Sequence, residues 1–117
     1  MHYSIGNEGL ILLIQVQGGL SKPEILACWE AIKAHPEYPR ATGALVLFDA
    51  VWWETSGDEL GDLAKRADEL RPIRWAFVTD EDLSYGMVRR FATQVEGAER
   101  FAVFRDEDIA RKWLDRQ

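Results

Sequence analysis

Two aspartates, Asp49 and Asp80, each follow a stretch of apolar residues that is typical of a buried strand, and they are the first candidates for chemistry. An aspartate at the carboxyl end of a strand can accept a phosphoryl group, but this reaction needs Mg²⁺ held by paired acids and a lysine that holds the phosphate. Gly18-Gly19 and Arg105 stand where those groups would be required. We therefore expect both aspartates to cap loops by accepting backbone hydrogen bonds, with metal-assisted chemistry at this pair as the alternative.

No nucleophile has the partners that covalent catalysis would need. Cys28 falls on the apolar face of a predicted helix, where a free cysteine is usually a small apolar side chain. His2 lies in the N-terminal segment and His35 at a helix end, so neither is close to a serine or cysteine nucleophile. Cysteines and histidines with the spacing of metal ligands are also missing. The sequence therefore predicts no enzyme, no metal and no other cofactor.

Aromatic and basic residues gather instead near the expected carboxyl ends of the strands, where open α/β sheets bind ligands. Two adjacent tryptophans, Trp52 and Trp53, are expected in a loop, where they cannot easily both point inward. They can cover a helix as part of the core, or they can form an aromatic rim to a ligand cleft or a homodimer contact. Tyr85 and Arg89-Arg90 are near in sequence, and an arginine there could hold an anionic head group. The candidate ligand-binding residues are Asp49, Trp52, Trp53, Tyr85 and Arg89.

Ser56 has two possible roles. The segment 56–59 (SGDE) has the spacing of a capping box, in which the serine side chain bonds the amide of Glu59 and contributes about 1 kcal/mol. A phosphate on Ser56 would also sit at a helix N-terminus, which is electrostatically favourable, although Asp58 and Glu59 would oppose it. Both roles, helix cap and phosphoacceptor, stay open.

An alternation of strands and helices must position these residues. Apolar runs bounded by turn residues predict five strands, at residues 3–5, 10–17, 44–48, 75–79 and 101–104. Gly18-Gly19 is expected to end the second strand, and residues 50–55 to form a loop. Apolar residues at helical spacing predict helices after caps at Ser21, Ser56 and Asp106, and a further one over residues 85–96 that Gly97 ends. The last helix is expected to bury Ile109, Ala110, Trp113 and Leu114.

The element order β-β-α-β-α-β-α-β-α predicts an α/β fold. We expect a single five-stranded, mostly parallel sheet with an antiparallel N-terminal edge strand and four helices, because strands that alternate with helices form parallel pairs through right-handed crossovers. Since the 117 residues contain no repeat or linker, residues 1–117 are expected to form one domain.

Charge and composition exclude several classes of function. Fourteen Lys+Arg against twenty Asp+Glu give a net charge of −6, which disfavours nucleic-acid binding through bulk charge. The longest apolar run, residues 10–14, is too short to span a bilayer, which takes about 20 residues. The N-terminal segment has no signal-peptide pattern, which favours a cytoplasmic protein. Edge strands and exposed tryptophans would permit a homodimer.

The segment 101–114 (FAVFRDEDIARKWL) resembles the end of the SpoIIAA-like group of the STAS superfamily. The segments 18–24 (GGLSKPE), 75–80 (WAFVTD) and 85–87 (YGM) are similar to the same group, so the resemblance spans nearly the whole chain. It implies a β/α superhelix like that of anti-sigma-factor antagonists and, more distantly, of CRAL-TRIO lipid-transfer domains. It also implies a binding role, and it matches Ser56 to the serine that takes a phosphate in the antagonists.

We therefore expect a non-enzymatic binding domain. Its ligand would be a small apolar or amphipathic molecule, or a protein partner, held near residues 52–56. The alternative is a phosphorylation-controlled regulatory module, similar to an anti-sigma-factor antagonist, that acts through Ser56.

Overall fold

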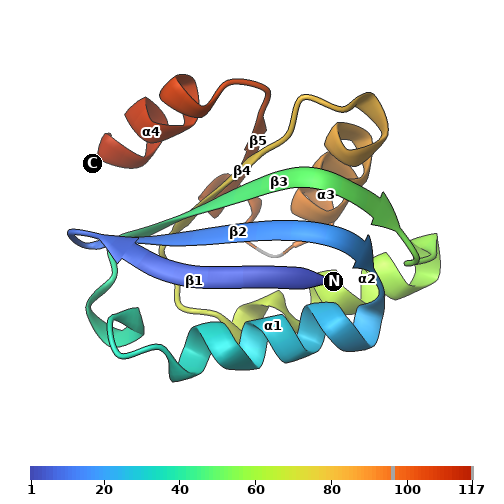
Figure 1. The fold of residues 1–117 in the computed structure, drawn as a ribbon, viewed down its shortest axis with the longest axis horizontal. Coiled ribbons are helices and arrows are strands. Elements are labelled where there is room, and N and C mark those ends of the chain that lie inside the picture. The colour runs from blue at the N-terminus through green and yellow to red at the C-terminus, as the bar shows by residue number, and fades with distance from the viewer. Residues whose placement is uncertain (96, 117) are drawn as a thin grey trace.

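The computed structural model describes residues 1–95 and 97–116, and it places five strands side by side in one sheet, in their order along the chain (Figure 1). The strands are β1 (His2–Glu8), β2 (Ile11–Leu20), β3 (Gly43–Trp53), β4 (Arg74–Val78) and β5 (Phe101–Phe104). β1 runs antiparallel to β2, and the other neighbouring pairs are parallel. The α/β class and the antiparallel N-terminal edge strand are as the sequence predicts.

Four helices connect or follow the strands. They are α1 (Lys22–Ala34), α2 (Gly57–Arg66), α3 (Asp82–Gln94) and α4 (Glu107–Asp115). The predicted caps Ser21, Ser56 and Asp106 each accept a hydrogen bond from a backbone amide in the first turn of their helix. α3 begins earlier than predicted because Glu81 caps it, while the predicted end at Glu96 lies outside the described residues. None of the helices in the described part of the chain has the length and apolar character that a membrane crossing requires.

The helices cover both faces of the sheet unequally. Figure 1 shows α1 and α4 on opposite sides of the strands. Because side chains alternate along a strand, Ala44 and Val46 of β3 join the main core with α1, α2 and α3, whereas Leu45 between them packs in a smaller cluster under α4. β3 is thus buried on both faces, as expected for a central strand flanked by parallel neighbours.

Three strands extend further than the sequence indicates: β1 (His2–Glu8) runs beyond the predicted residues 3–5, and β2 and β3 run beyond their predicted ends. Gly18-Gly19 does not end β2, and residues 50–53 are not a loop: Gly18 pairs with Val51, and β3 continues to Trp53. The register shifts after Val16, and Gly18 and Ala50 both adopt positive φ angles, of 85° and 49°. A β-bulge at this point accommodates the positive φ angles, and the pairing of β2 with β3 continues beyond it.

Ile109 is not buried as predicted. Its side chain is 56% exposed, while Ala110 and Leu114 are buried and Trp113 is partly exposed. The cause is that no other helix of the described chain lies on this face, so the sheet covers only one narrow side of α4.

Candidate ligand-binding site

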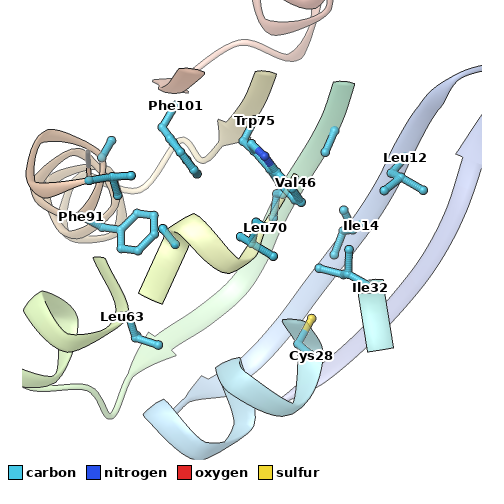
Figure 2. Close-up of a cluster of buried hydrophobic side chains, with 14 of the residues drawn as sticks. Leu12, Ile14, Cys28, Ile32, Val46, Leu63, Leu70, Trp75, Phe91 and Phe101 are labelled. Carbon is cyan, nitrogen blue, oxygen red and sulfur yellow. The ribbon is translucent and has the colours of Figure 1, made fainter. Parts of the chain in front are cut away.

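The main core is not completely filled. A cavity of about 90 Å³ lies between the inner face of the sheet and helices α1, α2 and α3. Figure 2 shows Ile14, Cys28, Leu63 and Phe91, each from a different element, directed toward one interior. Every described residue that lines the cavity has a hydrophobic side chain. Since a buried water needs polar partners, a cavity with such walls favours apolar occupants.

A row of aromatic rings forms one wall of this cavity. Phe48, Phe77 and Phe101 occupy β3, β4 and β5, and neighbouring rings stack with centroids 6.2 and 6.3 Å apart. Phe91 of α3 meets Phe101 edge-on at 5.9 Å and also contacts Trp29 of α1. Each such pair adds about 0.5–1.5 kcal/mol beyond burial, which holds the wall in place. The aromatic wall thus joins three strands to α3 and α1.

Trp53 closes the cavity near the carboxyl end of β3 and is fixed by a relay of hydrogen bonds. Its indole Nε1 donates to Ser84 Oγ at 2.9 Å, and Ser84 Oγ donates to Glu81 Oε1 at 2.8 Å. Ser84 is fully buried. The hydrogen bond from the Ser84 hydroxyl holds the pKa of the Glu81 carboxyl below its ordinary value. Trp53 is half-buried, as are Met1, Ile25, Trp29 and Phe48, so part of the cavity wall reaches toward solvent.

The five predicted ligand-binding residues lie in three places. Trp53 lines the core cavity. Tyr85 and Arg89 line a different hollow, between α3 and β5. Asp49 and Trp52 are exposed on the last part of β3, and neither lines the cavity or the hollow. The five residues thus do not gather around one hollow.

Asp49 and Asp80 do not form part of a larger acidic cluster. Both are exposed, and each lies two residues beyond the paired residues Leu47 and Val78. Within residues 1–95 and 97–116, no three His, Cys, Asp or Glu side chains are grouped as a metal ion would need.

Cys28 and Ser56 have clear structural roles. Burial raises the pKa of the Cys28 thiol to about 12, so the thiol stays protonated at neutral pH and is a poor nucleophile. Ser56 forms the predicted capping box: its Oγ accepts from the Glu59 amide at 3.1 Å, and Glu59 Oε1 accepts from the Ser56 amide at 3.0 Å. Near this cap, a Cβ at Gly57 would come within 3.1 Å of the Arg90 guanidinium, so a positive charge lies beside the start of α2.

Sequence reasoning did not identify the cavity, although it placed several of its wall residues in the core. Leu63, Val88 and Phe91 stand at the helical spacing of inward-facing apolar residues, but this spacing gives no sign that space remains among them. One signal was present: Phe48, Phe77 and Phe101 stand in three neighbouring strands that the sequence predicted to be parallel. A row of large rings across a sheet limits how closely helices can approach it.

Comparison with known structures identifies the fold. The crystal structure of an uncharacterized protein from the DUF3478 family with a SpoIIAA-like fold, from Shewanella loihica PV-4, matches this chain with a TM-score of 0.58. The match covers 97% of this chain and 92% of that chain, at 19% sequence identity. The chain has a SpoIIAA-like fold. The resemblance seen in segment 101–114 is therefore confirmed at the level of the fold. No family model matches the sequence of this SpoIIAA-like chain, and no curated protein matches it either.

Proposed function

We propose that this SpoIIAA-like chain is a non-enzymatic binding protein that holds a small apolar or amphipathic molecule in the cavity between the sheet and helices α1–α3. The observation that carries the proposal is the apolar cavity of about 90 Å³ in the main core. At about 24 cal/mol for each Å³, an empty cavity of this size costs the folded state about 2 kcal/mol. A ligand that fills the space would recover part of this energy.

The size of the cavity limits the ligand. An apolar cavity of roughly 150 Å³ accommodates benzene, so a cavity of about 90 Å³ suits a short alkyl segment or a similarly small group. A longer molecule would have to leave its remaining part among the half-buried residues Ile25, Trp29 and Phe48. An amphipathic molecule meets this condition, because its polar end can stay in water while its tail enters the core.

A binding role also agrees with the protonation state of the Cys28 thiol. Cys28 lines the cavity, but its raised pKa keeps it in the unreactive thiol form. We therefore assign Cys28 a packing role in the binding site rather than a catalytic one.

Cys28 offers a matched pair of variants for testing the cavity. Octanoate serves as the probe, because it has an alkyl tail and a charged end. Cys28→Leu adds apolar volume to the cavity and should weaken octanoate binding at least about tenfold, while it stabilises the fold by up to about 1–2 kcal/mol. Isothermal titration calorimetry measures the binding, and chemical denaturation measures the stability.

Cys28→Ala, at the same position, enlarges the cavity and is the control. It should destabilise the protein slightly and bind octanoate at least as well as the wild type. Equal affinity in the wild type and both variants would place octanoate outside the cavity and contradict the proposal. Failure of both the wild type and Cys28→Ala to bind octanoate or any shorter carboxylate would also contradict it.

The phosphorylation-controlled module remains a second candidate. The guanidinium of Arg90 beside Gly57 favours it, because a phosphate on the exposed Ser56 would have a cation nearby. The capping box opposes it, since a phosphate would bring more negative charge to Glu59. This role for Ser56 stays a prediction.

A further inference from the structure

A second hollow lies on the other side of α3 from the core cavity. It is an open groove of about 240 Å³ between α3 and β5, lined by Tyr85, Arg89, Ala92 and Thr93 of the helix and by residues 101–103 of the strand. The core cavity and this groove share Phe101, whose ring helps to separate them. The groove is open to solvent and runs along β5. This shape suits an extended peptide.

β5 presents unpaired backbone groups at this groove. It is the last strand in the sheet order and pairs only with β4 among the described strands. The carbonyl of Phe104 accepts from the Thr79 amide at 3.0 Å, so the backbone groups of Phe104 point toward the β4 side. Because the N–H and C=O groups of successive residues point alternately to the two sides of a strand, those of Val103 point to the free edge. Such groups can pair with a further strand.

One arginine gives the groove a positive charge, although the chain as a whole carries a net charge of −6. Arg89 lines it, is exposed, and makes no ion pair within the described residues. At one end, the Arg105 guanidinium stacks 4.3 Å from the centre of the Tyr85 ring and donates to Asp82 Oδ1 at 2.7 Å. None of the described residues that line the groove is acidic. The groove therefore favours a partner with negative charge.

We propose that this groove binds an extended acidic segment of another protein, which adds a strand to the free edge of β5 and places a carboxylate against Arg89. Main-chain hydrogen bonds to Val103 would provide affinity, as they do wherever a peptide extends a sheet, and Arg89 would select the charge. The proposal does not depend on what occupies the core cavity.

The test uses the full chain and a fluorescent hexapeptide of alternating valine and glutamate, whose binding is followed by fluorescence anisotropy. The peptide should bind saturably and more weakly as salt is added, while the same peptide with lysine in place of glutamate should not bind. Arg89→Glu should weaken binding at least about tenfold. Arg40→Glu is the charge-matched control. Arg40 is exposed on a short 3₁₀ helix (Tyr38–Arg40) and does not line the groove, so this variant should bind the peptide as the wild type does.

Val103→Pro tests the strand pairing separately from the charge. Proline removes the outward amide of Val103 and is tolerated on an edge strand, so circular dichroism should show a normal fold while peptide binding falls. Absence of saturable binding up to about 1 mM peptide would overturn the proposal. So would equal binding by Arg89→Glu, or by a peptide with methylated backbone nitrogens. A dimer that Val103→Pro dissociates in sedimentation experiments would assign the edge to a second copy instead.

Discussion

Trp52 and Trp53 are neighbours with opposite environments, because side chains alternate along β3. Trp52 is 60% exposed, and its indole lies against Gly19, where a Cβ would come within 2.7 Å of Nε1. Trp53 points inward, lines the cavity and bonds Ser84. The sequence alone identified the pair as unusual but could not separate the two residues, since their difference follows from a strand that continues further than predicted.

The relay from Trp53 through Ser84 to Glu81 predicts a specific dependence of stability on pH. Because the folded state holds the pKa of Glu81 below its ordinary value of 4.5, the unfolded state binds more protons as the pH falls below that value. The stabilisation is therefore complete above pH 4.5 and is lost as the pH falls through the lowered pKa.

Glu81→Gln should reduce the loss of stability between neutral pH and acid, as measured by urea denaturation at several pH values. It should not abolish that loss, because hydrogen bonds to positively charged partners also lower the pKa of Glu8 and Glu24. An unchanged pH profile in Glu81→Gln would mean that the relay contributes nothing to the acid dependence.

At the scale of elements, the sequence predicts the type and order of every strand and α-helix, but not the bounds of β1, β2, β3 and α3. Capping residues predict the starts of α1, α2 and α4 correctly, because serine and aspartate caps such as Ser56 and Asp106 satisfy amides that have no partner within the helix. The start of α3 was wrong because its cap is Glu81. The predicted ends of β2 and β3 were wrong because Gly18-Gly19 is usually a breaker, whereas here it follows a bulge and pairs with the distant Val51 and Trp52. Pairing between distant segments cannot be derived from local propensity.

The bulge predicts opposite effects of two substitutions. Ala50 has a φ of 49°, which favours glycine, so Ala50→Gly should raise the free energy of unfolding by about 0.5 kcal/mol. Gly18→Ala, at a φ of 85°, should lower it by about 1 kcal/mol or more. Chemical denaturation of both variants checks the pair, and a destabilising Ala50→Gly would contradict the backbone conformation described for β3.

At the scale of the whole molecule, element order was enough to predict an α/β fold with a mostly parallel sheet, because alternating strands and helices allow few arrangements. The SpoIIAA-like group came from the resemblance of segments such as 101–114, and the structural comparison confirms it for the fold. The cavity was not predictable in the same way. The cavity is the space that remains unfilled among side chains from β2, β3, α1, α2 and α3. Its volume depends on the distances between these elements, which the sequence does not give. The same applies to the groove at β5, because its shape depends on how α3 packs beside that strand.

The central claim is that the core cavity of this fold accepts an apolar molecule. Crystals of the wild-type protein under xenon pressure test it most directly, because xenon is apolar and fits an accessible cavity of about 90 Å³. The account predicts one strong xenon peak among Ile14, Cys28, Leu63 and Phe91, and a weaker or absent peak in Cys28→Leu. A closed core with side chains filling the space, or xenon bound only at the surface, would contradict it.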